Sequence, residues 1–205
     1  MVNKWGTIGI PADNRFLELY YEPESEQFLA HFYKGLGDGI GLKSLYARHF
    51  SEEEYRRLTP ESKHLTYEDV VISPELSKIY VNVYKVRMKN HAYDGYEWHS
   101  VREFNPETGG YGELVRAGDI KVAPPYCEAW IHRLRSIKDD GKQMLCTIAF
   151  KKDSESHTRP VDYYLCKYNL ISGQYRKITK LNKELSGDHK TSHRRSIKNL
   201  KSNSL

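Results

Sequence analysis

A repeat of about 60 residues constrains the fold of this chain more than any other feature of its sequence. Three segments each read as a short strand, a polar turn, a tyrosine and a second short strand, at 46–59, 101–114 and 165–179. The intervals between the central tyrosines, Tyr55, Tyr111 and Tyr175, are about 56 and about 64 residues. This recurrence indicates supersecondary units stacked side by side, each burying its apolar face against a neighbour.

Each of these hairpins follows another hairpin, so that one unit contains four strands. The preceding strand pairs are 16–21 with 27–33, 69–72 with 78–84, and 130–134 with 143–150. Aromatic and β-branched residues fill the runs and Pro, Gly, Asp and Ser bound them, which is typical of antiparallel hairpins. Gly141 and Gly173 tolerate the positive φ that such turns need. We therefore predict an all-β fold built from antiparallel four-stranded units, each the size of a propeller blade.

Two turn patterns carry a resemblance to TolB-like and related β-propellers. The first is Ser73-Pro-Glu-x-x-Lys-Ile-Tyr-Val, and the second is Phe104-Asn-Pro-Glu-Thr-Gly-x-Tyr. In that family, the first turn joins the inner strands of a blade and the second turn joins its outer strands. Asn169-Leu-Ile-Ser-Gly-Gln-Tyr repeats the second pattern, whereas the first unit has Ser51-Glu-Glu-Glu where a glycine is expected. The resemblance spans 16–181 and implies a partial β-propeller or a propeller-like fold.

The repeat predicts three blade-like units, at about 14–60, 65–120 and 128–182, within an all-β domain of residues 1–182. Propellers close with at least about four blades, so three units do not make an ordinary ring. Two copies could close one ring, the chain could complete a different partner, or it could be a degenerate relative of a longer propeller. The alternative fold is a single β-sandwich or wide barrel of ordinary size for one domain.

Several shorter segments carry expectations of their own. Residues 4–10 read as a strand that could pair with the last unit, as ring-closing strands do. Ser51 could instead cap a short helix over 51–58. The polar stretches 88–95 and 153–160 read as loop insertions, which is where binding residues usually lie.

Charge and composition indicate a basic tail, free thiols and the expected location of the protein. The basic residues from Lys183 onward give a predicted disordered tail, 183–205, that carries most of the formal net charge of +5. Nucleic-acid binding is expected to be no more than a weak, salt-dependent contact of this tail. Cys127, Cys146 and Cys166 lack close spacing and read as free thiols. No run approaches a membrane span and no signal sequence is evident, so we expect a cytoplasmic protein.

Aromatic residues suggest an interaction module, our first functional hypothesis. The chain has 16 tyrosines against six phenylalanines, and tyrosine suits both half-buried strands and binding surfaces. We expect a protein or glycan partner, or self-association, with contacts from aromatic residues near loop ends. These candidates are Tyr93, Tyr96, Trp98, Tyr126 and Trp130.

A second hypothesis is a small hydrolase or lyase with a polar centre at 91–99. This segment contains His91, Asp94, Glu97 and His99, and strand alternation would place Glu97 and His99 on one face. Zinc needs three or four converging ligands, so we expect no metal and no cofactor here. The sequence also lacks the Gly-x-Ser-x-Gly motif of many serine hydrolases. The interaction module is therefore the favoured hypothesis.

Overall fold

The computed structural model describes residues 14–22, 26–37, 40–73, 78–89, 92–138, 141–153 and 161–181. Within these residues the chain forms β-strands and no helix, so the all-β prediction is confirmed. The strands are β1 (Asn14–Glu22), β2 (Gln27–Gly37), β3 (Ile40–His49), β4 (Arg56–Arg57), β5 (Leu65–Ser73), β6 (Lys78–Lys89), β7 (Ala92–Phe104), β8 (Tyr111–Arg116), β9 (Tyr126–Lys138), β10 (Gln143–Lys152), β11 (Val161–Asn169) and β12 (Tyr175–Leu181).

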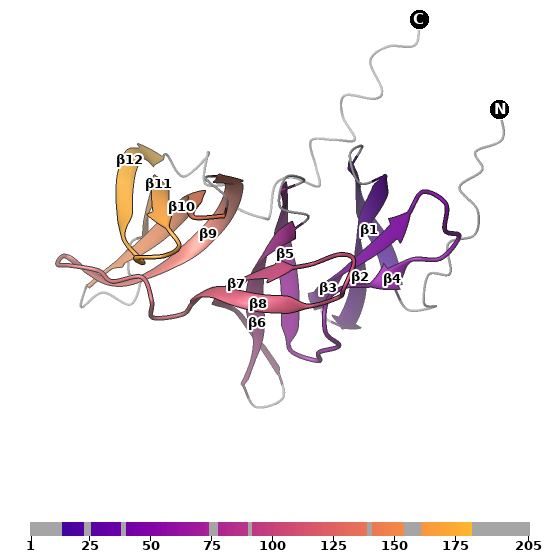
Figure 1. Cartoon of the computed structure of the whole chain (residues 1–205). Coiled ribbons are helices and arrows are strands. Elements are labelled where there is room, and N and C mark those ends of the chain that lie inside the picture. Colours follow the sequence, from indigo (N-terminus) through magenta and orange to yellow (C-terminus); the bar gives the residue numbers. More distant parts are fainter. Residues whose placement is uncertain are drawn as a thin grey trace, which may run out of the picture.

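These strands pair into three separate antiparallel sheets of four strands each. The first sheet contains β1 to β4, the second β5 to β8 and the third β9 to β12, and each runs in chain order. The sheets follow one another side by side, with the second between the other two (Figure 1). Each sheet therefore has the makeup of a propeller blade, and the hydrogen bonding does not join the strands into one sandwich sheet or barrel.

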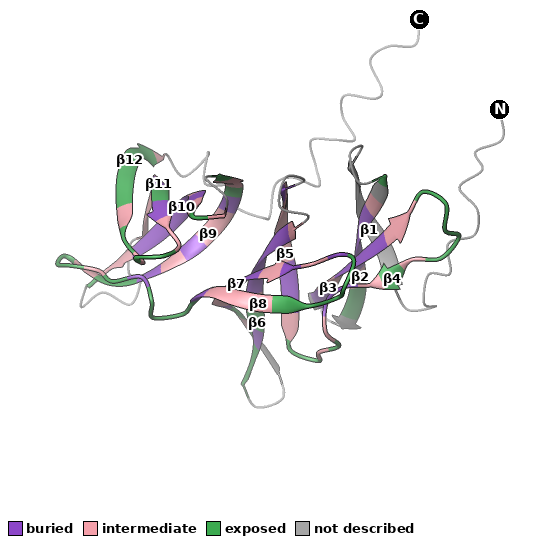
Figure 2. Ribbon diagram, viewed as in Figure 1, coloured by how far each residue is buried: buried purple, intermediate pink, exposed green. Residues whose placement is uncertain are grey.

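Most of the buried apolar side chains lie in two layers between the sheets (Figure 2), and a smaller cluster of Ala30, Phe32 and Tyr46 belongs to the first sheet alone. Side chains alternate along β6, so that Ile79, Val81 and Val83 pack toward the first sheet while Tyr80 packs toward the third. The second sheet is thus covered on both faces. This double burial explains why 79–84 is almost continuously apolar, as expected for a strand with no solvent-facing side.

The predicted loop at 88–95 is wrong, because β6 and β7 continue through most of it. Met88 pairs with Tyr93 and Lys89 with Ala92, and we call this extension, 85–97, the β6–β7 arm. The polar side chains that suggested a loop belong to a strand pair with solvent access, a setting in which polar residues are normal. The first sheet supports the arm, since the Tyr96 hydroxyl donates to the Gly41 carbonyl over 3.1 Å.

The alternative helix at 51–58 does not form. The chain turns after β3, where the Glu52 amide donates to the His49 carbonyl over 3.0 Å and the His49 amide donates to the Glu52 carboxylate over 3.0 Å. Side-chain bonds of this kind favour a turn over a helix start. The predicted strand 4–10, residues 154–160 of the second predicted loop and the basic tail 183–205 lie outside the described residues.

The cysteines are free thiols, as predicted, but they differ in exposure. Cys146 and Cys166 lie opposite each other on β10 and β11 and are fully buried, whereas Cys127 is exposed. Burial raises the pKa of the Cys166 thiol to about 11, which keeps it protonated at neutral pH. In the residues that the structure covers, no helix is long and apolar enough to cross a membrane.

Candidate functional site

β-Bulges interrupt the first strand of each sheet. The register shifts at Leu17 in β1, at Asp69 in β5 and at His132 in β9. A bulge leaves backbone groups without a ladder partner and redirects the neighbouring side chains. The bulges of β5 and β9 lie where the second and third sheets meet, and polar side chains gather there.

Asn82 links the second sheet to the bulge of the third. Its side chain is fully buried and its Oδ1 accepts a hydrogen bond from Trp98 Nε1 over 2.8 Å. Its Nδ2 donates to the Ile131 carbonyl over 3.1 Å, while the Tyr84 hydroxyl donates to the His132 carbonyl over 3.1 Å. Side chains of the second sheet therefore bond the carbonyls at and beside the bulge of the third sheet.

Asp69 completes what we call the inter-sheet polar centre (Asp69, Asn82, Tyr84 and Trp98). Its backbone has a φ of 41°, and its Oδ2 accepts a hydrogen bond from the Leu134 amide over 3.3 Å. Burial raises the pKa of this carboxyl, against the attraction of Arg133. The ionised Asp69 carboxylate is therefore less stable here than in the unfolded chain. Raised carboxyl pKa values of this kind occur both at functional sites and in buried structural hydrogen-bond networks.

Of the residues in this centre, only Trp98 is predicted as a contact residue from the sequence, and its expected place is at a loop end. Trp98 is instead 6% exposed and lies in the core between the second and third sheets. The signal for the rest was present in 79–84, where Asn82 is the only amide in an apolar strand. A buried amide needs hydrogen-bond partners, but the sequence does not show which backbone groups supply them.

The predicted residue His99 belongs to a different group, the Glu113 cluster, on β7 and β8. Glu113 accepts hydrogen bonds from Arg102 at 2.6 and 3.1 Å, and Arg116 pairs with it at 2.9 Å. The hydrogen bonds from Arg102 lower the pKa of the Glu113 carboxyl. His99 Nδ1 lies 3.0 Å from Ser100 Oγ and 4.0 Å from Glu113 Oε1, and burial followed by the charge of Arg102 lowers the pKa of this imidazole.

The other members of the predicted polar centre point elsewhere. Asp94 contacts Arg87, whose Nη2 donates to the Asp94 carbonyl over 2.8 Å. Glu97 is exposed and lies opposite Lys85. A bulge at His99 interrupts the strand alternation that would place Glu97 and His99 on the same face. His91 lies outside the described residues. Within the described ranges, no group of three or more His, Cys, Asp or Glu side chains is placed to hold a metal ion.

The predicted contact residues also occupy different surroundings. Tyr96 is 44% exposed on the β6–β7 arm, and the backbone of Tyr93 lies in β7, although its side chain is not among those described. Trp130 is half-buried on β9. Tyr126 is half-buried at the start of β9, and its hydroxyl donates to Asp162 Oδ2 over 3.0 Å.

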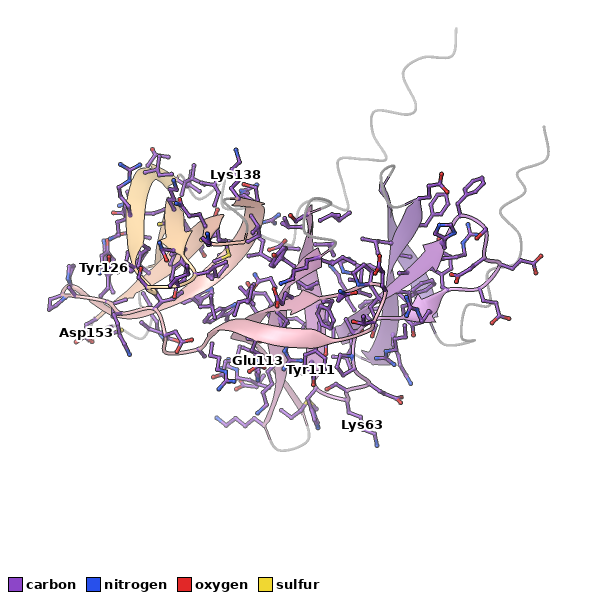
Figure 3. All side chains as sticks on the ribbon, viewed as in Figure 1. Lys63, Tyr111, Glu113, Tyr126, Lys138 and Asp153 are labelled. Atoms are coloured by element: carbon purple, nitrogen blue, oxygen red, sulfur yellow. The ribbon has the colours of Figure 1, made fainter. Side chains whose placement is uncertain are left out.

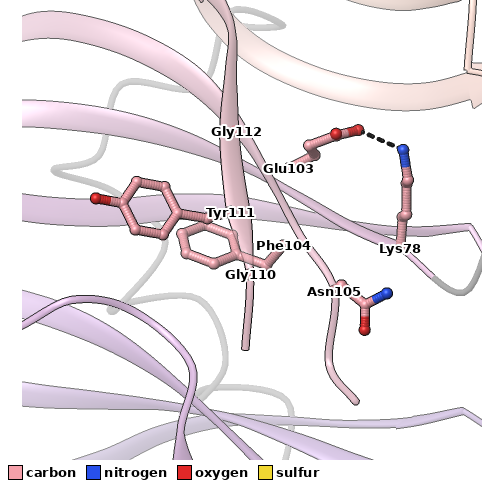
Figure 4. Close-up of a pocket in the computed structure, with 7 residues that line it drawn as sticks. All are labelled: Lys78, Glu103, Phe104, Asn105, Gly110, Tyr111 and Gly112. Atoms are coloured by element: carbon pink, nitrogen blue, oxygen red, sulfur yellow. Dashed lines mark hydrogen bonds and ion pairs between the residues drawn. The ribbon is translucent and has the colours of Figure 1, made fainter. Parts of the chain in front are cut away.

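A shallow pocket of about 240 Å³ lies beside β8 (Figure 4). Phe104 is fully buried, Tyr111 is 54% exposed, and their ring centroids are 5.7 Å apart. On the opposite side of the pocket, Lys78 pairs with Glu103 at 2.9 Å. Tyr111 and Glu113 both project from β8 (Figure 3), so the pocket and the Glu113 cluster share one strand. The volume is below that of a typical small-molecule site.

Asp162 is the most strongly paired carboxylate of the third sheet. Lys152 and Lys180 contact its two oxygens at 3.0 and 2.9 Å, and Tyr126 donates to it as well. Burial acts to raise the pKa of Asp162, but these three hydrogen bonds outweigh it and hold the pKa at about 2. A carboxyl whose pKa falls on folding stabilises the folded state wherever it is ionised.

Asp162→Asn is expected to lower the free energy of unfolding at pH 7 by about 2 kcal/mol. The wild-type contribution is complete above the unfolded pKa of about 3.8 and is lost as the pH falls through about 2. Urea unfolding at pH 7 and at stepwise lower pH measures this, with the exposed Asp153→Asn as the control. A difference between wild type and Asp162→Asn that persists unchanged at pH 2 would contradict the assignment.

No protein-family model and no curated protein matches this sequence. Among solved structures, the GH74 enzyme of Niastella koreensis is similar over 76% of this chain, with 10% identity and a TM-score of 0.43. The chain spans 27% of that protein's length. The putative TolB of Agrobacterium tumefaciens matches 82% of each chain, with 10% identity and a TM-score of 0.31. A puromycin-hydrolysing peptidase of Mycobacterium tuberculosis is similar over 84% of this chain and 39% of the peptidase chain, with 8% identity and a TM-score of 0.25.

These similarities are too low to carry an argument about this chain. The description of the sheets as blade-like therefore rests on their strand order and on the cores between them.

Proposed function

We propose that this chain is a propeller-like interaction module whose two end sheets bind those of a second copy. Two chains would together supply six sheets, which is enough to close a ring. The observation that carries the proposal is that the end sheets repeat positions that are buried between sheets inside the chain.

The third sheet shows this equivalence most clearly. Tyr84 and Ala149 are both the seventh residue of their strands, β6 and β10, and their cross-strand partners are Trp98 and Tyr163. The face of the second sheet that carries Tyr84 and Trp98 packs on the third sheet, and Trp98 is almost fully buried there. In the third sheet Tyr163 remains partly exposed, and none of the three described sheets covers this outer face.

The outer face of the first sheet carries aromatic rings and an arginine. Phe50 is 66% exposed and stacks on Phe28, with ring centroids 6.2 Å apart. The Arg48 guanidinium lies 5.0 Å from the Phe28 ring and 5.4 Å from the Tyr55 ring. Aromatic and arginine side chains of this kind are enriched at the centres of protein interfaces.

The two ends also differ in charge. Exposed carboxylates at Glu52, Glu53 and Glu54 follow Phe50 at the first end, whereas the exposed Lys167 lies on β11 of the third sheet. Opposite charge at the two ends favours contact between unlike ends and disfavours contact between like ends. Self-association should therefore join the first sheet of one copy to the third sheet of the other.

Light scattering over a range of concentrations in moderate salt tests the proposal. We expect a molar mass that approaches twice the 24.0 kDa of the chain as concentration rises. The dimer should weaken at high salt, because the end charges are exposed and are screened. A mass of 24.0 kDa at every concentration would overturn the ring of two copies.

Two single variants and their mixture define the contact. Phe50→Glu and Lys167→Glu alter the first and third ends respectively, and each alone should give a monomer because every contact then contains one altered face. Mixed together, they can form a dimer with one fully wild-type contact, so the mixture should partly recover the dimer mass. A symmetric contact between like ends would respond to only one of the variants.

Ile171→Glu places the same charge on the exposed turn between β11 and β12 and serves as the matched control. Lys167 is exposed on β11, so Lys167→Glu reverses a surface charge and leaves the core between the second and third sheets unchanged. Circular dichroism of each variant separates loss of contact from loss of structure.

A further inference from the structure

Three aromatic rings surround the ammonium group of Lys177. Its Nζ lies 4.2 Å from the ring centroid of Phe150, 4.4 Å from that of Tyr164 and 4.5 Å from that of Tyr126. A cation within about 6 Å of a ring centroid is attracted by the π-face, and here three faces act on one group. We call Tyr126, Phe150 and Tyr164 the aromatic cage.

The walls of the cage are held by contacts that do not involve Lys177. The hydroxyls of Tyr126 and Tyr164 are 3.3 Å apart, and Tyr126 also donates to Asp162. Asp162 is in turn bound by Lys152 and Lys180. Phe150 is fully buried on β10, and its ring packs against both tyrosines. A site whose walls are fixed in advance binds a ligand with a smaller entropic cost.

The position of Lys177 allows its side chain to leave the aromatic cage. It lies on β12, the outer strand of the third sheet, and residues 176–180 are all exposed. Among the described residues, no carboxylate forms an ion pair with its Nζ, which distinguishes it from Lys152 and Lys180. Its hold on the cage is therefore the cation–π attraction, which is worth only a few kcal/mol at most.

We propose that the aromatic cage is a binding site for an alkylammonium group, such as a quaternary ammonium or a methylated amine, and that Lys177 occupies it as an internal competitor. A cage of rings favours cations with a low charge density, because they lose less hydration energy on leaving water than a primary ammonium does. The site lies on the side of the third sheet that faces the second, so it is independent of the proposed ring contact.

Titration with tetramethylammonium chloride, followed by NMR of the tyrosine rings, tests the proposal, with sodium chloride at the same ionic strength as the blank. We expect Lys177→Ala to bind the probe at least about tenfold more tightly than wild type, since the competitor is gone. Adding Tyr164→Ala, or Tyr126→Leu if that protein does not fold, should abolish the response. Arg176→Ala removes an exposed cation of the same strand and should leave the affinity near that of wild type.

A folded Lys177→Ala protein with no saturable response to the probe would overturn the proposal. Equal affinity of wild type and Lys177→Ala would also overturn it, because Lys177 would then not compete. Lys177→Gln keeps the length of the stem without the charge, and it supplies the same comparison if the alanine variant unfolds. Tightening in Arg176→Ala as large as in Lys177→Ala would indicate a general charge effect and would equally contradict the cage.

Discussion

Asn82→Ala is expected to lower the free energy of unfolding by about 3 to 5 kcal/mol. The variant removes the acceptor of Trp98 Nε1 and the donor to the Ile131 carbonyl, and both remaining groups are buried. An unsatisfied buried polar group costs about 1 to 3 kcal/mol, and the lost side-chain volume adds a cavity cost. A domain is typically stable by only about 5 to 15 kcal/mol, so the third sheet should be strongly affected.

Urea unfolding followed by tryptophan fluorescence measures this loss, because Trp98 reports directly on the contact. Gln174→Ala removes an exposed amide from the turn before β12 and should change stability by less than about 0.5 kcal/mol. If Asn82→Ala destabilised the chain no more than Gln174→Ala does, the inter-sheet polar centre would not hold the second and third sheets together.

Phe104→Ala is expected to cost about 3 to 5 kcal/mol through loss of core packing. Phe104 lies fully buried at the end of β7, opposite Ile79, where the first and second sheets pack together. Its ring meets Tyr67 edge-on, with centroids 6.2 Å apart, and lines the pocket beside Tyr111. The variant removes a large ring from a position that its neighbours cannot fill without moving the backbone.

Tyr111→Ala is the matched comparison, because it removes the other ring of this pair from an exposed position. It should cost less than about 1 kcal/mol, as surface substitutions usually do. Thermal and urea unfolding of both variants give the two values. Similar losses in the two variants would mean that the core does not extend between the first and second sheets at this point.

The hairpins were predictable from the sequence because their signals are local. Alternation of apolar residues and turns such as Ser172-Gly173 act over a few residues, and the structure places strand pairs there. The β6–β7 arm was missed for a physical reason. Its residues are polar because water covers them, and polar strands and polar loops have the same composition. Contact of Tyr96 with Gly41, far away in the sequence, decides between the two.

The candidate sites were less predictable because they depend on convergence. The proximity of His99 to Asp94 and Glu97 in the sequence suggested one polar centre, but β7 directs these side chains to different partners. The aromatic cage draws Tyr126, Phe150 and Tyr164 from three strands and Lys177 enters it from a fourth, so no local spacing in the sequence indicates it. Tyr126 was found only as an aromatic residue near a loop end.

The sequence by itself determined the strand pairs, the turns and the division into three four-stranded units, because each follows from short-range alternation and turn chemistry. The tertiary structure decided which faces are buried, where the bulges fall and which side chains meet. Asn82 shows the difference most plainly. Its place in an apolar strand marks it as a buried amide, but its partners are carbonyls at a bulge about 50 residues away, and only packing of the sheets brings the two together.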